Sequence, residues 1–312
     1  MSVAIRPFAA EYEAILPLAN LIGPSPLTTA QLAEQHAQFP ADGLRTMLVA
    51  VDGAGHTLGY GSATARPTLW PGQFYATVVT APSARRQGVG AALLEALEGW
   101  ARANGAVVLR TSLADTDEAS AGFFRHRGYA LEAHRLVSHL DVPSFDESRF
   151  PGVAESSGVT FFRFSDLPRD EAMPRLYELY KVTDMDSPGY AGTDPARYPS
   201  FAHWYDEMFS EGNTLEDAIF IAADGDRWVG VTILQKEGED RVLYTEYTGV
   251  LREYRGRSIA LALKLLSVQY AKAYGAPYMT TRNDASNAPM LAVNQKMGYY
   301  KASGRYWLAK KL

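Results

Sequence analysis

Two loops with the composition of an anion-binding site occur at residues 82–90 and 252–260, at equivalent places in two similar stretches of the chain. Each loop combines arginines with small residues directly ahead of an expected amphipathic helix. A helix begins with unpaired N–H groups and a partial positive charge, and arginine donates hydrogen bonds to phosphate in pairs. Small residues let a ligand approach the backbone closely. Each loop is therefore predicted to bind a pyrophosphate. The residues predicted to hold it are Arg85, Arg86, Gln87, Gly88, Val89 and Gly90 in the first loop, and Arg255, Gly256, Arg257, Ser258 and Ala260 in the second.

These loops have two other interpretations. A lone loop of this kind is often a surface turn with solvated arginines, but its recurrence favours binding. The Gly88-Val89-Gly90 segment also suggests a dinucleotide fingerprint. That fingerprint requires a third glycine at a fixed spacing and a surrounding βαβ repeat, and neither is found here.

The loops belong to two copies of one domain. Residues 80–129 align with 250–299 without a gap, pairing Arg85 with Arg255, Gly105 with Gly275, and Gly128-Tyr129 with Gly298-Tyr299. A repeat this long predicts tandem domains, since solenoid repeats are only about 20–50 residues long. A Pro-, Gly-, Ser- and acid-rich stretch predicts a linker. The expected boundaries are 1–142 for the first domain, 143–157 for the linker and 158–312 for the second domain.

Each copy has the pattern of an α+β domain. In the first copy, alternation and apolar runs predict strands at 3–6, 47–51, 58–63, 73–80, 107–111 and 136–140, and helices at 11–21, 28–38, 88–104 and 118–127. In the second, they predict strands at 159–164, 218–223, 229–235, 242–250, 279–281 and 305–310, and helices at 258–274 and 288–296.

Composition excludes several classes of function. The chain has 312 residues, enough for two cores, and a formal charge of −5, which gives no basic footprint for nucleic acid. With no cysteine it forms no disulfide, thiolate zinc site or cysteinyl acyl-enzyme. The six histidines lack metal-ligand spacing, so no metal is expected. No leader or membrane-spanning run is visible, which favours a soluble, cytoplasmic protein, either a monomer or a homodimer.

The motif Arg85-x-x-Gly88-x-Gly90 after a strand, followed by Gly105 and the Gly128-Tyr129 end, resembles the GNAT superfamily of acetyl-CoA-dependent acyltransferases. Two such domains in tandem are similar to the mycothiol synthase-like proteins. The resemblance implies an α/β/α sandwich in each domain, with a mixed, mostly antiparallel sheet flanked by helices, and acetyl-CoA as the donor. It also implies that backbone N–H groups of the preceding strand polarise the thioester carbonyl. The strand residues concerned are Val78, Val79 and Thr80 in the first copy and Thr248 and Val250 in the second.

The second copy has a further signature, Thr281-x-Asn283-x3-Asn287-x2-Met290-x3-Asn294-x3-Gly298-Tyr299. This series resembles a GNAT subgroup with the same asparagines, which implies that Asn287 and Asn294 contact the pantetheine arm or the thioester. Asn283 or Asn287 could instead cap the helix. Asn294 is a poor helix former in mid-helix, so we expect it to bind something specific.

The resemblance implies direct attack of a substrate amine on the thioester, with a base on the strand before the loop. Glu246 is the candidate general base, because the first copy has Ala76 at the matching position. The alternative is a strand glutamate that faces solvent or pairs with an arginine. The family often uses a tyrosine four residues before the Gly-aromatic end as the thiol acid, but this chain has Phe124 and Asn294 there. The remaining candidates for the acid are Tyr244, Tyr247, Tyr299 and Tyr300.

The expected function is therefore acetyl transfer from acetyl-CoA to a primary amine of a small molecule in a ternary complex. The second copy is the expected catalytic domain, with Glu246, Asn294 and Tyr299 as its candidate catalytic residues. Two alternatives stay open: the first copy is the active one, or the protein senses acyl-CoA without turnover. Segment 184–190 with Phe201, His203, Trp204 and Tyr205 lies where the family places its acceptor site. Its acids and aromatics suit a cationic or amphipathic acceptor, although aromatics at this spacing also occur in cores.

Overall fold

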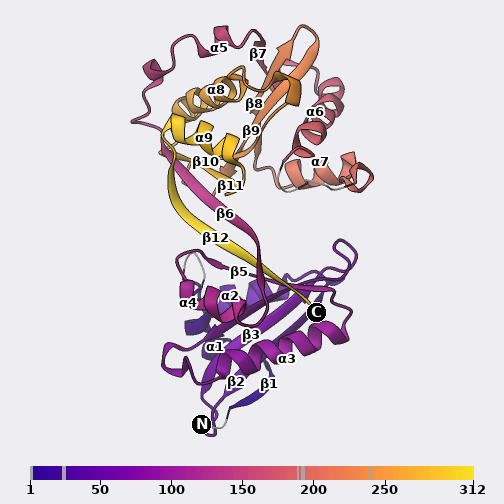
Figure 1. Cartoon of the computed structure of the whole chain (residues 1–312), viewed down its shortest axis with the longest axis vertical. Helices are drawn as coiled ribbons and strands as arrows, with labels where there is room; N and C mark the ends of the chain where they lie inside the picture. The colour runs from indigo at the N-terminus through magenta and orange to yellow at the C-terminus, as the bar shows by residue number, and fades with distance from the viewer. Residues whose placement is uncertain (1–2, 23–25, 188–189, 191–193, 239) are drawn as a thin grey trace. The chain divides into compact units, whose positions relative to one another are not determined.

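A computed structural model of the chain describes residues 3–22, 26–187, 190, 194–238 and 240–312 (Figure 1). They divide into two compact units: the first comprises residues 1–133 and 306–312, and the second comprises residues 134–305. Each unit is a mixed sheet flanked by helices, so the α+β class predicted from the sequence is confirmed.

The first unit has the strand order β1-β2-β3-β4-β5-β12, in which β4 and β5 run parallel and β1 to β4 pair antiparallel. Its strands are β1 (Ala4–Pro7), β2 (Leu44–Val51), β3 (Thr57–Ala65), β4 (Gln73–Thr80), β5 (Val108–Ala114) and the end of β12 (Tyr300–Lys311). Its helices are α1 (Tyr12–Ala19), α2 (Thr29–Ala37), α3 (Val89–Ala103) and α4 (Glu118–Arg125). Helices α1 and α2 pack on the face of Val49 and Tyr60, whereas α3 packs on the opposite face with Ala50 and Leu58.

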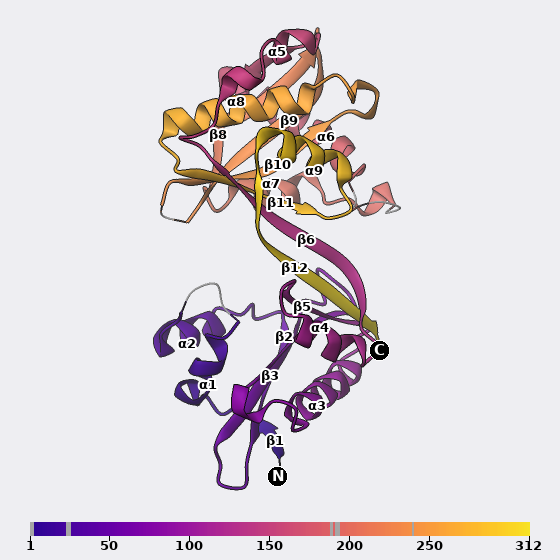
Figure 2. The ribbon, with the colours of Figure 1, turned by 60° about the vertical axis from the view of Figure 1, so that its left-hand side comes forward.

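The second unit repeats this plan with the order β6-β11-β10-β9-β8-β7, in which β10 and β11 run parallel. Its strands are β6 (Ala130–Asp141), β7 (Thr160–Arg163), β8 (Thr214–Asp224), β9 (Arg227–Glu237), β10 (Val242–Val250) and β11 (Tyr278–Asp284). Its helices are α5 (Val153–Ser156), α6 (Arg169–Asp184), α7 (Phe201–Phe209), α8 (Ile259–Tyr274) and α9 (Ala288–Met297). Figure 2 shows α8 lying along the strands β8 and β9, where Ile259 and Leu263 fill the space above Gly230.

The closing strands of the two repeats are exchanged, which corrects the expected boundaries 1–142 and 158–312. Residues 135–141 of β6 pair with β11 in the second unit, and the end of β12 lies beside β5 in the first. Leu308 is fully buried in the core of the first unit beside Leu109, and the Leu312 N–H donates to Val107 O at 3.1 Å. The repeat alignment could not reveal this exchange, because both strands carry the alternation that either sheet requires.

The segment expected to be a linker, 143–157, is packed into the second unit. Phe145 and Phe150 stack with ring centroids 5.8 Å apart and are buried against Met279 and Val268. Lys272 Nζ on α8 donates to Phe145 O at 2.8 Å and pairs with Glu147 at 2.9 Å. The linker interpretation was wrong. Pro, Gly and Ser interrupt the hydrophobic periodicity of this segment, but two isolated phenylalanines, Phe145 and Phe150, anchor it in the core.

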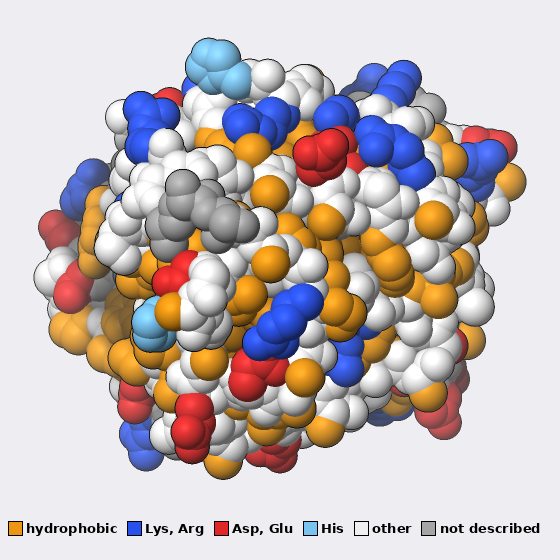
Figure 3. All heavy atoms as spheres, turned by 90° about the horizontal axis from the view of Figure 1, so that it is seen from below, with side chains coloured by type: hydrophobic (Ala, Val, Ile, Leu, Met, Phe, Trp, Pro, Cys, Tyr) orange, Lys and Arg blue, Asp and Glu red, His pale blue; other side chains and the backbone are white. Residues whose placement is uncertain are grey.

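The charge of the surface is mixed. On the face drawn in Figure 3, basic, acidic and apolar side chains of the described residues are interspersed. That face offers no field of a single sign for a polyanion, in keeping with the formal charge of −5.

Candidate active site

The strands β10 and β11 of the second unit pair over three residues and then separate. The paired residues are Leu243 with Met279, Tyr244 with Thr280, and Thr245 with Thr281. β10 continues to Val250 and β11 to Asp284 without further pairing between them. The edge of β10 from Glu246 onward therefore has backbone groups that no neighbouring strand satisfies, and a ligand in this opening can bind to them.

A β-bulge lies at the start of this opening. The register of β10 against β9 shifts between Thr245 and Tyr247, so Glu246 has no partner residue in the ladder. A bulge adds one residue to a strand, increases its local twist and turns a side chain to a new direction. In the first unit, the matching strand β4 pairs with β3 without a shift from Phe74 to Thr80, and its residue at this place is the buried Ala76.

The carboxyl group of Glu246 is partly buried, and burial raises its pKa. A hydrogen bond with Tyr244 and the charge of Arg282 act in the opposite direction, whereas the charges of Asp184 and Glu207 raise the pKa further. Arg282 forms its ion pair with Glu237 and lies 4.3 Å from the Tyr244 ring centroid. A carboxylate with a raised pKa is a better base near neutral pH than an exposed glutamate.

Glu246 lines a pocket of about 530 Å³ in the second unit. Helices α6 and α7, described residues of the segment between them and the turn after α7 supply its walls, and β9 and β10 contribute one residue each. The lining residues are Tyr180, Asp184, Tyr190, Tyr198, Pro199, Trp204, Asp206, Glu207, Met208, Ser210, Glu211, Gln235 and Glu246. Of the segment expected at the acceptor site, residues 188–189 lie outside the described residues, and Asp184, Tyr190 and Trp204 line this pocket.

The loop after β10 forms a turn that leads into the N-terminus of α8. A short 3-10 turn over Arg252–Tyr254 precedes Arg255, and then Gly256 and Ser258 adopt φ of 79° and 60°. Ser258 is the N-cap residue of α8, and its side chain makes no capping hydrogen bond. The first N–H groups of α8 are thus available to an anion at the place where the sequence predicts a pyrophosphate site.

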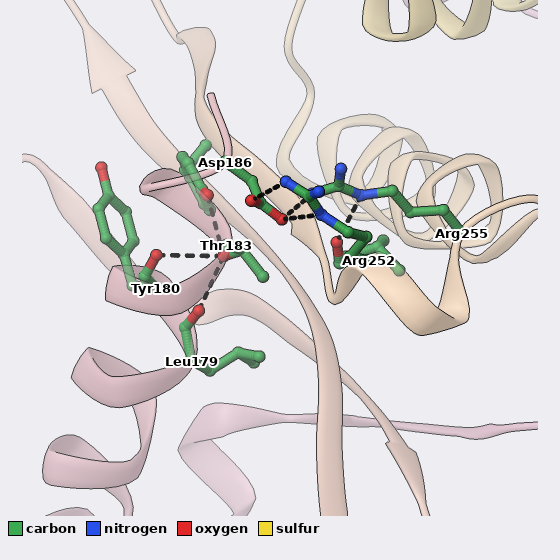
Figure 4. A network of polar contacts seen from close by, with 8 residues as sticks. Leu179, Tyr180, Thr183, Asp186, Arg252 and Arg255 are labelled. Carbon is green, nitrogen blue, oxygen red and sulfur yellow. Dashed lines mark hydrogen bonds and ion pairs between the residues drawn. The ribbon is translucent and has the colours of Figure 1, made fainter. Parts of the chain in front are cut away.

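The arginines of this loop are held by an aspartate from the segment after α6 (Figure 4). Asp186 pairs with Arg252 at 2.5 Å and with Arg255 at 2.9 Å, and their charges lower the pKa of its carboxyl group. Arg255 Nε also donates to Val250 O at 3.1 Å. The same strand and segment are joined by Tyr247, whose hydroxyl donates to Thr183 Oγ1 at 2.9 Å.

The matching loop of the first unit has the same backbone course with different residues. A 3-10 turn over Pro82–Ala84 leads to Arg86 and Gly88 at φ of 61° and 85°, and α3 begins at Val89 without a side-chain cap. Within the described part of the chain, Arg85 is exposed and forms no ion pair. A Cβ at Gly90 would lie 3.3 Å from Thr80 Oγ1, so this glycine brings the helix close to the strand.

Of the asparagines singled out in the second unit, one caps a helix and the other two form a hydrogen-bonded pair. Asn287 is the N-cap of α9 and accepts from Met290 N at 3.3 Å, which is the capping alternative to cofactor contact. Asn294 is buried and donates to Asn283 Oδ1 at 2.7 Å, while its own Oδ1 has no partner among the described residues. Asn294 therefore has an unused acceptor beside the end of β11.

Tyr299 packs beneath this cluster against a lysine that sequence reasoning missed. Lys264 of α8 is 2% exposed, its Nζ has no hydrogen-bond partner among the described residues, and burial lowers its pKa to about 7. It lies 5.1 Å from the ring centroid of Tyr299. Burial raises the pKa of Tyr299 to about 12. The only sequence signal for Lys264 was a cation on the apolar side of a helix.

The other tyrosines that could act as the general acid differ in their burial and in their neighbours. Burial raises the pKa of Tyr244 to about 12, and Tyr244 is beside Glu246. Tyr247 is held by Thr183 and packs on Tyr180 with ring centroids 4.1 Å apart. Tyr300 is 56% exposed and packs edge-on against His139, away from the pocket lining. Of these four tyrosines, Tyr244 is the one that shares a hydrogen bond with Glu246.

The first unit has an apolar interior at the positions that match Glu246 and Asn294. Ala76 and Phe124 are both buried in its core. Tyr129, which matches Tyr299, donates to Glu98 at 3.2 Å, and Lys310 pairs with both oxygens of Glu98 at 2.8 Å. The lysine beside the tyrosine is thus paired in the first unit, whereas Lys264 in the second is not.

The described residues contain no group of three or more histidines or acids arranged to hold a metal ion. Among the same residues, no helix is long and apolar enough to cross a membrane.

A sheet with separating parallel strands, followed by a turn into an uncapped helix, defines the class of acyltransferases that the sequence resembled. A sequence profile of the acetyltransferase (GNAT) family matches residues 12–129 and 175–299, and the chain belongs to this family. The expected class of enzyme, a GNAT-type N-acetyltransferase in two copies, is thereby confirmed at the level of the family.

Individual relatives are more distant. A 94-residue stretch is 29% identical to N-alpha-acetyltransferase 30 of Schizosaccharomyces pombe, and it covers 28% of this chain and 63% of that protein, less than two thirds of its length. Among solved structures, a GCN5-related N-acetyltransferase from Sphaerobacter thermophilus is similar over 99% of this chain and 95% of its own, with a TM-score of 0.67 and 18% identity. A tandem GNAT protein from the clavulanic acid biosynthesis pathway covers 99% and 98%, with a TM-score of 0.62 and 18% identity. At these identities the solved structures support the fold.

Proposed function

We propose that this protein transfers an acetyl group from acetyl-CoA to a primary amine of a small molecule, and that the reaction takes place in the second unit. The observation that carries this proposal is the bulge at Glu246. It combines a partly buried carboxyl group, an unpaired strand edge and a pocket at one place. In the first unit, the unbroken ladder of β4 and the buried Ala76 provide neither a base nor an equivalent bulge.

Different residues of the second unit would bind the acetyl donor and the amine acceptor. The loop 252–260 and the N-terminus of α8 would hold the pyrophosphate of acetyl-CoA, with Arg255 as the paired donor. The open edge of β10, at Thr248 and Val250, offers backbone N–H groups for the thioester carbonyl. Glu246, on the pocket side, takes a proton from the acceptor ammonium so that the amine has a free electron pair.

Acetyl-CoA supplies the activated acetyl group as a thioester. The amine nitrogen bonds to the carbonyl carbon, the carbon–sulfur bond breaks, and the sulfur leaves with its electron pair as a thiolate. The acceptor ammonium loses two protons in all: Glu246 takes the one that frees the electron pair, and the second, released as the amide forms, neutralises the thiolate. Tyr244, which shares a hydrogen bond with Glu246 and keeps its proton at neutral pH, is a candidate to return a proton to the thiolate.

A second role is proposed for the first unit, because its loop has an arginine without an ion pair among the described residues. Arg85 is free to bind a phosphate, and Gly88 adopts the left-handed backbone without the strain that Ser258 has in the second unit. The first unit would bind CoA without catalysing transfer.

The test of both roles is a binding and turnover experiment with acetyl-CoA. Calorimetric titration of the whole chain gives the number of sites, and Arg85→Ala and Arg255→Ala assign them. Release of CoA in the presence of a panel of amines gives turnover. The proposal expects amine-dependent release that Arg255→Ala lowers more than Arg85→Ala does. Binding of acetyl-CoA without release for any amine would contradict transfer and support an acyl-CoA sensor.

A further inference from the structure

The pocket beside Glu246 holds more acid than the removal of one proton requires. Five of its lining residues are acidic, and the described lining contains no lysine, arginine or histidine. The acids are Asp184, Asp206, Glu207, Glu211 and Glu246. One carboxylate suffices as the general base, so the other four create a negative field in a site that the reaction alone does not explain.

Two of these acids are withdrawn from solvent. Asp184 and Glu246 are both partly buried, and burial raises the pKa of each carboxyl group. Asp184 accepts a hydrogen bond from the Tyr198 hydroxyl at 3.0 Å, and its charge raises the pKa of Glu246. Like charges held close in a partly buried site are unfavourable, and a ligand that brings cations relieves this repulsion.

The pocket also has an aromatic side. Trp204 is 3% exposed and lines the pocket together with Tyr180. The Trp204 ring lies 5.6 Å from that of Tyr180, and these rings give the pocket an aromatic wall that binds ammonium groups and methylenes.

We propose that the acceptor substrate is a small polycation: an amine with at least one further cationic group. This inference rests on the proposed function for the reacting amine, which gives its proton to Glu246. The second cationic group pairs with Asp184 and with the exposed acids of α7 and the turn after it, such as Glu207. The pocket volume of about 530 Å³ lies within the range of small-molecule sites.

The test compares matched probes with one and two ammonium groups. Pentylamine and cadaverine have the same carbon chain, and their binding to the whole protein is measured by calorimetry at low salt without acetyl-CoA. Because a hydrogen bond to a charged group is worth about 1.5–3 kcal/mol, cadaverine is expected to bind roughly 10- to 100-fold more tightly. Equal affinities for the two amines would overturn the proposal.

Variants assign the effect to the pocket. Asp184→Asn keeps an acceptor for Tyr198 and should lower the ratio of cadaverine to pentylamine affinity at least about threefold. Glu207→Gln, at a side chain that is 58% exposed, should lower it in the same direction without a risk to folding. Asp226→Asn, at an exposed acid outside the lining, is the control and should leave the ratio as it is. An unchanged ratio in both pocket variants would overturn the proposal.

Turnover separates this inference from the proposed function. If cadaverine binds more tightly as expected but no amine causes release of CoA from acetyl-CoA, acetyl transfer is contradicted and the polycation site stands. If pentylamine and cadaverine are acetylated with equal kcat/KM and bind equally, transfer stands and the polycation inference is overturned.

Discussion

The unpaired lysine beneath Tyr299 allows a stability prediction with a sign that depends on pH. Lys264 has a pKa lowered by burial from 10.5 to about 7. Between these values the unfolded chain binds a proton that the folded chain does not, so the free energy of unfolding rises with pH across this window. Below pH 7 both states are protonated and the full cost of the buried charge remains.

The magnitude follows from the same two values. At about 1.4 kcal/mol per pH unit, the interval from about 7 to 10.5 corresponds to about 5 kcal/mol. Lys264→Met keeps a side chain of similar length and removes the titrating group. It is therefore expected to stabilise the second unit at pH 7 by at most about 4 kcal/mol and by much less near pH 10.

The matched control is Lys310→Met in the first unit. Lys310 lies 5.6 Å from the Tyr129 ring centroid, as Lys264 does beside Tyr299, but it is paired with Glu98. Lys310→Met removes two charged hydrogen bonds from Glu98, although Arg102 still lies 3.2 Å from this carboxylate. It is therefore expected to destabilise the first unit, by about 1.5–3 kcal/mol.

Amide hydrogen exchange measures the two units separately, with α8 reporting on the second and α3 on the first. Slower exchange of α8 in Lys264→Met at pH 7, with faster exchange of α3 in Lys310→Met, is the expected result. The reasoning would be refuted if Lys264→Met speeded the exchange of α8, or if its effect were the same at pH 7 and pH 10.

Three further predictions concern other parts of the account. Asp186→Asn removes the ion pair that holds Arg255 and leaves this arginine free to bind phosphate. Since an exposed ion pair is worth about 0.2–1 kcal/mol, calorimetry should show acetyl-CoA binding to the second unit about two- to fivefold more tightly. Weaker binding would show that Asp186 orients the arginine instead. Leu308→Ala should destabilise the first unit by about 2–5 kcal/mol and speed exchange in α3, whereas faster exchange confined to α8 would contradict the strand exchange. The kcat/KM for an amine should fall as the pH drops through the raised pKa of Glu246, at a midpoint above the ordinary value of 4.5, and a midpoint below it would argue against Glu246 as the base.

Local signals predicted the strands and the turns into the helices on the proposed donor side of the site. The bounds of β4 and β10, 73–80 and 242–250, are those expected from the apolar runs, and both loops enter their helices where the small residues indicated. These features depend on backbone freedom at Gly88 and on periodicity within one element. Short stretches of sequence determine these properties, so a single sequence is enough to predict them.

The acceptor side depends on contacts between distant elements. Glu246 was found because the two copies differ at that position, but the bulge that frees it arises from the pairing with β9. Asp186 and Arg255 are 69 residues apart in the sequence, so no local pattern predicts their ion pair. The exchange of β6 and β12 is likewise not determined locally, because the alternating pattern of each strand fits the closing position of either sheet. These features follow from tertiary packing, which periodicity alone does not specify.

The most direct test of the central claim is the turnover of Glu246→Gln with acetyl-CoA and cadaverine, beside Glu216→Gln as a glutamate control outside the pocket lining. Loss of a general base lowers the rate by about 10²–10⁴-fold, so Glu246→Gln should release CoA at least about 100-fold more slowly while it still binds acetyl-CoA, and Glu216→Gln should match the unmodified protein. Unchanged turnover in Glu246→Gln would contradict the assignment of the chemistry to this residue.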